Sequence, residues 1–248
     1  MGRHLLSCGK RFLQQNEYDI LCFQEVCGQQ TFVGNIACRN DCFQQLQQVL
    51  GATHEGILTK ASTFTSSPTA YDGNAIFYRK EFLLKAQDII WFNERTTPFP
   101  TTSQSYEDIG RNALCLTLER DGQQVKIISA HLPWARTKEE QPHQTKMNKN
   151  LITYIASLQK PWILAGDLNL APYQPSVVAL EKYGQNLTKV YRVKNTIDPT
   201  LHTRWEIFAP GEAIDYIFVS SDVQVKHFEV LQNIHMSDHF GLSAMLDI

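Results

Sequence analysis

The stretch Leu164-Ala-Gly-Asp-Leu-Asn-Leu-Ala-Pro172 follows a short apolar run and carries a carboxylate and an amide two residues apart. The apolar run Pro161–Ala165, ended by Gly166, predicts a buried strand that leaves the core here. Side chains alternate along an extended backbone, so Asp167 and Asn169 are expected on one face and the neighbouring leucines in the core. An Asp and an Asn at a strand end suit a hard cation or a phosphate group, and they equally suit an ordinary turn.

Length and composition indicate one globular domain over residues 1–248. The chain has 248 residues, of which 43% are apolar, and contains no segment with linker composition. Its formal net charge of −2 argues against tight, non-enzymatic nucleic-acid binding, but not against an enzyme that meets phosphates only at its site. We expect a monomer.

The cysteines and the N-terminus bear on the compartment. The six cysteines lack the paired spacing of a disulfide framework, so free thiols and a cytoplasmic rather than secreted location are expected. Cys38 and Cys42 could form half of a zinc site, but no second pair completes it. The N-terminal residues 1–7 have no apolar core, so neither a signal peptide nor a transmembrane segment is expected there, although the true N-terminus could lie upstream.

Hydrophobic periodicity and turn residues predict mostly strands, with helices between them. The clearest local signal is Asp121-Gly122 between two apolar runs, which predicts a hairpin. The segment between Val26 and Asp72 is expected to be irregular apart from one helix, with loops at 62–69 and 93–109 and around 202–205. Helices are expected at about 3–16, 41–50, 137–158 and 176–183. Strands are expected at 19–25, 74–79, 82–91, 113–120, 124–130, 161–165, 213–220, 223–231 and 240–246.

Strands dominate and do not alternate regularly with helices. Two sheets packed face to face with helices outside explain this order better than a doubly wound sheet.

Polar residues close or open several of these strands. A rigid scaffold presents its chemistry at such ends, so their number favours a site over a series of turns. A solvated strand end remains open for Glu25, and a core histidine for His131. Asp215, within the apolar run Ile214–Phe218, needs a partner, and a histidine is the usual one. The set is Glu25, His131, Asp167, Asn169, Asp215, Asp238 and His239.

In their order along the chain, five motifs resemble the endonuclease/exonuclease/phosphatase family, also called the DNase I-like family. They are Gln24-Glu25, Ser129-Ala-His131-Leu-Pro, Gly166-Asp-Leu-Asn169, Ile214-Asp-Tyr-Ile-Phe218 and Ser237-Asp-His239-Phe. Gly73-Asn-Ala-Ile and Arg111-Asn-Ala-Leu also look like family positions. The resemblance runs from about Asp19 to the C-terminus. It implies a four-layered α/β sandwich, with two mainly antiparallel sheets flanked by helices, and metal-dependent hydrolysis of a phosphate ester.

The resemblance also implies residue roles. Glu25 resembles the ligand of Mg²⁺, with Mn²⁺ as an alternative ion, and Asp238 a residue completing the metal site. Asp167 and Asn169 resemble the pair that positions the phosphate and the attacking water. The remaining roles are a catalytic histidine, His239, oriented by Asp215; a second histidine, His131; and phosphate contacts from Arg111 and Asn74.

One departure from the family pattern concerns the first strand. The family usually begins with an Asn-bearing strand inside the sheet, and no such strand precedes Glu25 here. Either the natural protein begins upstream, or this chain lacks one strand and one site residue. The first is expected, since losing an interior strand would expose a long unpaired edge.

The shared motifs define a phosphate ester and no more, because specificity resides in loops. Trp134, Trp205, His202 and Arg204 could stack on a base or meet a lipid headgroup. No loop contains a long apolar finger for membrane insertion, so a nuclease or another soluble phosphodiesterase acting on nucleic acid is the leading hypothesis. The alternatives are a sphingomyelinase-like or phosphoinositide-type phosphoesterase and a non-catalytic binding module.

Overall fold

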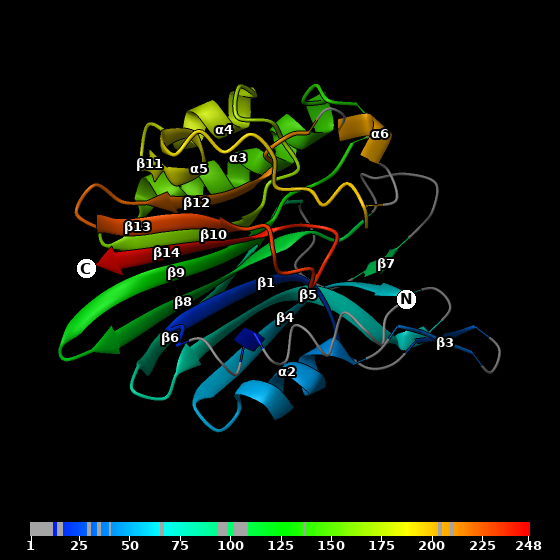
Figure 1. The fold of residues 1–248 in the computed structure, drawn as a ribbon, viewed down its shortest axis with the longest axis horizontal. Coiled ribbons are helices and arrows are strands. Elements are labelled where there is room, and N and C mark those ends of the chain that lie inside the picture. Colours follow the sequence, from blue (N-terminus) through cyan, green and yellow to red (C-terminus); the bar gives the residue numbers. More distant parts are fainter. Residues whose placement is uncertain are drawn as a thin grey trace.

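The computed structural model describes residues 12–13, 17–28, 31–33, 36–39, 41–64, 67–93, 99–101, 109–135, 137–202, 205–208 and 211–248. Two sheets lie face to face with helices on both outer faces, which gives a four-layered α/β sandwich (Figure 1). The fold class predicted from the sequence is confirmed. None of the helices in the described ranges is long and apolar enough to cross a membrane.

The smaller sheet has four strands, in the spatial order β1 (Ile20–Gly28), β5 (Ser67–Arg79), β4 (His54–Phe64) and β7 (Phe99–Thr101). The larger has six, in the order β11 (Gln185–Asn186), β12 (Asp215–Val219), β10 (Trp162–Asp167), β9 (Gln123–His131), β8 (Asn112–Arg120) and β6 (Leu83–Trp91). Two ribbons complete the strands: β13 (Gln224–Leu231) with β14 (Gly241–Asp247), and β2 (Thr31–Val33) with β3 (Ile36–Arg39).

Helices cover both outer faces (Figure 1). Helix α2 packs on β1 and β5, whereas α3 packs on the six-stranded sheet. Their bounds, with those of the shorter helices, are α2 (Cys42–Leu50), α3 (Pro142–Ser157), α4 (Pro175–Leu180), α5 (Leu187–Val190) and α6 (Trp205–Phe208).

Strand β8 explains the core, because its alternate residues point to opposite layers. Leu114, Leu116 and Leu118 pack between the two sheets, whereas Ala113 and Cys115 face the layer of α3. Both faces of the strand are therefore buried. At about 25 cal/mol per Å² of apolar surface, this burial is the main term that holds the sandwich together.

The predicted hairpin is present. β8 pairs with β9 up to Arg120 opposite Gln123, and the turn residues Asp121 and Gly122 have φ angles of 54° and 80°. Positive φ at both turn residues is the twist that joins antiparallel strands, which is why Asp-Gly predicted this element.

The expectation of irregular structure between Val26 and Asp72 was wrong. β4 and the first part of β5 lie in this segment and pair antiparallel, and the described part of the expected loop 62–69 belongs to these strands. Their composition hid them, because hydroxyl and charged residues interrupt the apolar alternation. Backbone pairing and a Ser62–Asp72 hydrogen bond replace apolar burial there.

Three smaller expectations also changed. Helix α3 begins at Pro142 rather than 137, because Gln141 and Gln144 form a capping box there. Strand β7 interrupts the expected loop 93–109, and α6 lies where a loop was expected after residue 204. The helix expected at 3–16 lies outside the described residues except for 12–13, which are helical.

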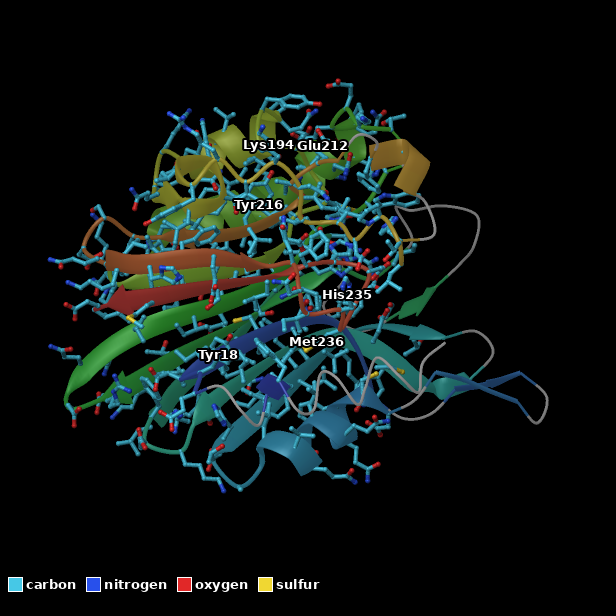
Figure 2. All side chains as sticks on the ribbon, in the orientation of Figure 1. Tyr18, Lys194, Glu212, Tyr216, His235 and Met236 are labelled. Atoms are coloured by element: carbon cyan, nitrogen blue, oxygen red, sulfur yellow. The ribbon has the colours of Figure 1, made fainter. Side chains whose placement is uncertain are left out.

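The edges of β1 and β14 bear on the expected first strand. Among the described residues, β1 pairs only with β5 and β14 only with β13. Tyr18, just before β1, hydrogen-bonds through its side chain to Ser243 of β14 and so connects the two edges (Figure 2).

Cys22 and Cys115 are free thiols, as the sequence predicted for these two residues. Burial raises the pKa of the Cys22 and Cys115 thiols to about 12, so both are protonated and unreactive. The Cys38 side chain, which with Cys42 could form half of a zinc site, lies outside the described part.

Candidate active site

Three neighbouring strands of the larger sheet bring His131, Asp167 and Asp215 together. β9 runs parallel to β10 with His131 opposite Asp167, and β12 runs antiparallel with Asp215 opposite Asp167. Residues opposite one another in paired strands project to the same face. His131 Nε2 accordingly lies 3.7 Å from the Asp167 Oδ2 atom.

His239 joins this row from the loop before β14. Its Nδ1 lies 2.9 Å from Asp215 Oδ2, and the ligand atoms of His239, Asp215 and Asp167 all lie within 4.8 Å of one another. A carboxylate on Nδ1 sets the ring orientation and leaves Nε2 for other partners. The histidine expected as the partner of Asp215 is therefore at hydrogen-bonding distance from it.

The backbone of the stretch Leu164–Pro172 differs from the extended conformation predicted from the sequence. β10 ends at Asp167, and Asn169 has φ of 52°, so the backbone is not extended through Asn169. The Asn169 N–H donates to Asp167 Oδ1 at 2.7 Å, and its side-chain amide donates to the Leu132 carbonyl at 3.0 Å. The segment is thus an Asx-type turn, and the same turn holds the carboxylate beside the histidines.

Gly166 lies within β10 rather than ending it, which corrects a second detail. A Cβ at this position would stand 1.9 Å from the Ala130 carbonyl oxygen of β9. Only glycine therefore allows β9 and β10 to approach closely at the point where His131 and Asp167 are placed. The hydroxyl of Tyr216 (Figure 2) donates to the Leu170 carbonyl at 2.6 Å and holds the far side of the turn.

Burial and neighbouring charges separate the pKa values of these groups. Burial lowers the pKa of His239, but the charge and hydrogen bond of Asp215, with Asp167 and Asp238, outweigh it and raise the pKa to about 10. Burial and the Asp215 charge raise the pKa of Asp167 to about 7. Burial, with the nearby charge of Arg111, holds the pKa of His131 well below its usual range. Near neutral pH, His239 is therefore cationic, His131 neutral, and Asp167 poised to exchange a proton.

Glu25 reaches the site from the smaller sheet through a β-bulge. The register of β1 and β5 gains one residue between Phe23 and Val26, and Glu25 in that bulge has φ of 53°. A bulge turns a side chain out of the regular alternation. Gln24 donates to the Ser129 hydroxyl of β9 at 3.0 Å, which ties this end of β1 to the strand of His131.

Glu25 shares a pocket with residues of β4, β5 and β9 and with Arg111, which directly precedes β8. The lining residues are Glu25, Ala61, Asp72, Gly73, Asn74, Arg111 and His131. The Glu25 carboxylate is 56% exposed, and its Oε1 lies 3.7 Å from a guanidinium nitrogen of Arg111, whose side chain is 11% exposed. The pocket therefore combines an accessible carboxylate with a largely buried cation.

Two polar atoms of this pocket lack a hydrogen-bond partner in the part of the chain that the structure describes: Asn74 Oδ1 and Arg111 Nε. Leaving a buried polar atom unsatisfied costs about 1–3 kcal/mol. The amide oxygen beside a carboxylate suits Mg²⁺, which prefers oxygen ligands, and the guanidinium N–H suits a phosphate oxygen. The donors of Glu25 and Asn74 thus fit the metal implied by the family resemblance.

Asp238 lies in a different group of contacts. Its described partners are Ser237, which donates to Oδ1 at 3.1 Å, and His202, whose Nε2 is 4.0 Å from Oδ2. It is absent from the residues that line the Glu25 pocket. The expectation that Asp238 completes the metal site of Glu25 stays a prediction.

Two residues of the site were missed in the sequence. Asp72 lines the Glu25 pocket, and its position two residues before Asn74 in a strand could have indicated a shared face. His202 was considered only as a residue that stacks on a base or meets a lipid headgroup, but it lies against His239 with ring centroids 5.7 Å apart. No local pattern could show this, because the contact depends on how two distant loops meet. Arg204 and the side chain of Trp205 lie outside the described part.

Comparisons with known proteins concern the fold and the family. No curated protein shows significant sequence similarity to the chain. Among solved structures, an endonuclease/exonuclease/phosphatase of Bacteroides vulgatus has a TM-score of 0.75 at 19% identity, with 99% of this chain and 91% of that chain covered. The mannosyl-6-phosphatase of Bacteroides thetaiotaomicron has a TM-score of 0.67 at 18% identity, covering 99% and 91%. D. rerio TDP2, in complex with a single-strand DNA product, has a TM-score of 0.65 at 17% identity, covering 98% and 93%.

At such identities these likenesses concern the fold. The family itself is established from the sequence, because the model of the Endonuclease/Exonuclease/phosphatase family matches residues 10–239. The chain therefore belongs to the Endonuclease/Exonuclease/phosphatase family, whose members are phosphoester hydrolases.

Proposed function

We propose that this protein is a Mg²⁺-dependent phosphoesterase that hydrolyses phosphodiesters, with nucleic acid as its substrate class. The observation that carries the proposal is the row of His131, Asp167 and Asp215 at adjoining strand ends, with His239 on Asp215. Perturbed pKa values gather at functional sites, and here a buried carboxylate with a raised pKa lies beside a cationic histidine.

The separated pKa values assign the proton transfers. Water attacks the phosphorus atom and gives its proton to Asp167, whose pKa of about 7 suits a general base. His239 carries a proton at neutral pH and gives it to the leaving oxygen as the ester bond breaks. His131, neutral at this pH, offers an uncharged hydrogen bond to the phosphate.

The pocket at Glu25 supplies charge stabilisation. Glu25 and Asn74 would hold Mg²⁺, which neutralises charge that develops on the phosphoryl oxygens. Arg111, with an unsatisfied buried N–H, binds a phosphate oxygen from the other side. Asn169 keeps the Asp167 carboxylate oriented through its N–H and so acts as a positioning residue.

The choice of substrate class rests on two points. The loops contain no long apolar finger for a membrane surface, and the fold resembles that of a protein solved with a single-strand DNA product. A sphingomyelinase-like or phosphoinositide-type activity, a sugar-phosphatase activity and a non-catalytic binding role are the competing hypotheses.

The test is a substrate panel with the purified chain. Plasmid DNA, single-stranded oligonucleotide, a chromogenic phosphodiester, a chromogenic phosphomonoester and sphingomyelin or phosphoinositide vesicles are each incubated with Mg²⁺, with Mn²⁺ and with EDTA. We expect metal-dependent cleavage of nucleic acid that His239→Gln abolishes and His227→Gln, an exposed histidine of β13, does not change.

Each other pattern rejects the proposal in a defined way. Turnover of vesicles or of the monoester alone would reject nucleic acid as substrate. Turnover that survives EDTA would reject the metal requirement. No turnover of any substrate, combined with binding of the oligonucleotide, would favour the non-catalytic role.

A further inference from the structure

The described structure holds a second group of metal-binding side chains beside the row of His131, Asp167 and Asp215. His202, Asp238 and His239 each present one ligand atom, and these atoms all lie within 4.8 Å of one another. None of the three residues lines the pocket of Glu25 and Asn74. The group therefore offers a cation a different place from the Mg²⁺ site proposed above.

Backbone pairing brings these residues together from distant parts of the chain. Ile197 and His239 form an isolated antiparallel bridge, in which Asp198 N–H donates to the Asp238 carbonyl at 2.9 Å. The N–H of His202 donates to the Asp198 carbonyl at 2.9 Å and closes the turn that carries the ring. These backbone bonds hold the two loops that carry the three side chains.

The distances suit a small transition metal. His202 Nε2 and Asp238 Oδ2 are 4.0 Å apart. Ligand atoms around a tetrahedral Zn²⁺ with bonds of 2.0–2.1 Å lie about 3.4 Å apart. Side-chain movements of less than 1 Å would therefore bring the group to a bonding geometry.

The surroundings orient both rings. Asp215 holds Nδ1 of His239 at 2.9 Å, so Nε2 is the atom that binds a metal once the metal displaces its proton, as in carboxylate–histidine–zinc arrangements. The His202 ring, 14% exposed at its side chain, packs edge-on against Phe208 with centroids 5.2 Å apart. The Asp238 side chain is 48% exposed, which leaves a fourth ligand position for water.

The donor types select against Mg²⁺. Two imidazole nitrogens and one carboxylate suit Zn²⁺, whereas Mg²⁺ prefers an all-oxygen shell. We propose that His202, Asp238 and His239 form a Zn²⁺ site whose occupation blocks the phosphoesterase. The blocking effect rests on the proposed function, because bound Zn²⁺ takes the His239 nitrogen that would otherwise act on the leaving oxygen.

Binding is measured first, without substrate. Co²⁺ replaces Zn²⁺ as a spectroscopic probe, because its visible absorption reports a site of low coordination number with nitrogen ligands. Titration of the Co²⁺-loaded chain with Zn²⁺ then gives the Zn²⁺ affinity by displacement. The samples are the wild-type chain, His202→Gln and Asp238→Asn. The matched controls are His235→Gln (Figure 2), which lies on the same loop as His239 but pairs with Asp198, and His227→Gln in β13.

We expect Zn²⁺ affinity to fall at least tenfold in both site variants and to stay unchanged in both controls. Equal affinity in the wild-type chain and in both site variants would overturn the site. Circular dichroism identifies a variant that has not folded. In that case the Zn²⁺ affinity of the other site variant decides whether the site exists.

Inhibition is measured second, on a cleaved substrate at saturating Mg²⁺. Each variant is compared with its own rate without Zn²⁺, and we expect the Zn²⁺ concentration for half inhibition to rise at least tenfold in His202→Gln. Unchanged half inhibition would overturn the blocking role. A chain that binds Zn²⁺ through His202 but hydrolyses nothing would overturn the proposed function and the blocking role while the site itself stands.

Discussion

Replacing Asp215 with asparagine tests the assignment of proton transfers directly. The substitution keeps the shape of the side chain but removes the charge 2.9 Å from Nδ1 of His239. At an effective dielectric constant of 20, a charge pair at this distance is worth about 6 kcal/mol. The pKa of His239, raised from 6.5 to about 10, corresponds to about 5 kcal/mol, so the Asp215 charge is large enough to account for it.

Without that charge, burial lowers the pKa of His239 and only Asp167 and Asp238 oppose it. We expect the pKa of His239 to fall to about its ordinary value of 6.5 or lower. The pKa of Asp167 should fall as well, because the Asp215 charge contributes to raising it. Both limbs of the pH–rate profile should therefore move to lower pH.

Two assays measure these shifts. NMR titration of labelled histidine in EDTA follows the His239 ring independently of activity, with His239→Gln giving the assignment. The pH dependence of kcat/KM at constant Mg²⁺ follows the reaction. The wild-type rate should rise through about pH 7, as Asp167 ionises, and stay level until His239 deprotonates near pH 10. At pH 8 the variant should be slower by a factor of about 10² or more.

The control is Asp198→Asn, which changes a buried carboxylate paired with His235 rather than with His239. It should leave the His239 titration in place. The reasoning is refuted if His239 of the wild-type protein titrates near 6.5, or if Asp215→Asn leaves the titration where it was.

Three further predictions concern the Mg²⁺ dependence, the stability cost of the buried Asp167 carboxylate and the packing of β10 against β9. Glu25→Gln should raise the Mg²⁺ concentration for half-maximal activity at least tenfold, because the pocket loses its exposed carboxylate, while Glu229→Gln on β13 should not. Asp167→Asn should abolish activity but raise the thermal midpoint in EDTA. The pKa of Asp167 is about 7 in the folded protein and 3.8 ordinarily, so ionisation of this carboxyl opposes folding by up to about 4 kcal/mol. The gain in thermal midpoint should therefore grow from pH 4 to 7 and then level off. An equal gain at every pH would contradict this reasoning. Gly166→Ala should lower the free energy of unfolding in urea by at least about 3 kcal/mol, because its Cβ would meet a β9 carbonyl oxygen at 1.9 Å. Gly122→Ala, with nothing within 4 Å of its Cβ, should lower it by about 1 kcal/mol from its positive φ alone. Equal losses would refute the packing argument.

The elements that could be predicted from the sequence are those whose conformation depends on residues close together in the chain. Asp121-Gly122 predicted the hairpin because a turn with two positive φ angles depends on the residues of the turn itself. The stripes of α2 and α3 were visible because a helix repeats over a few residues. The strand predicted at 74–79 is the second half of β5, but β4 and the first half of β5 were not visible, because their stability comes from pairing with each other and not from apolar alternation.

The candidate site also has one part that the sequence predicted and one part that only the structure shows. The sequence placed His131, Asp167 and Asp215 at strand ends, because an apolar run that stops at a polar residue is a local signal. Only the tertiary structure decided that the three strands lie next to one another in register.

Contacts between loops were beyond the sequence altogether. The left-handed turn at Asn169, the bulge that turns Glu25 toward Arg111 and the contact of His202 with His239 each need a partner far away in the chain. The pKa values of Asp167 and His239 likewise depend on burial and on charges that meet only after folding. The sequence by itself thus determined which residues are candidates for the chemistry, whereas the tertiary structure decided their distances and their charges, because both arise from packing between segments that the chain keeps far apart.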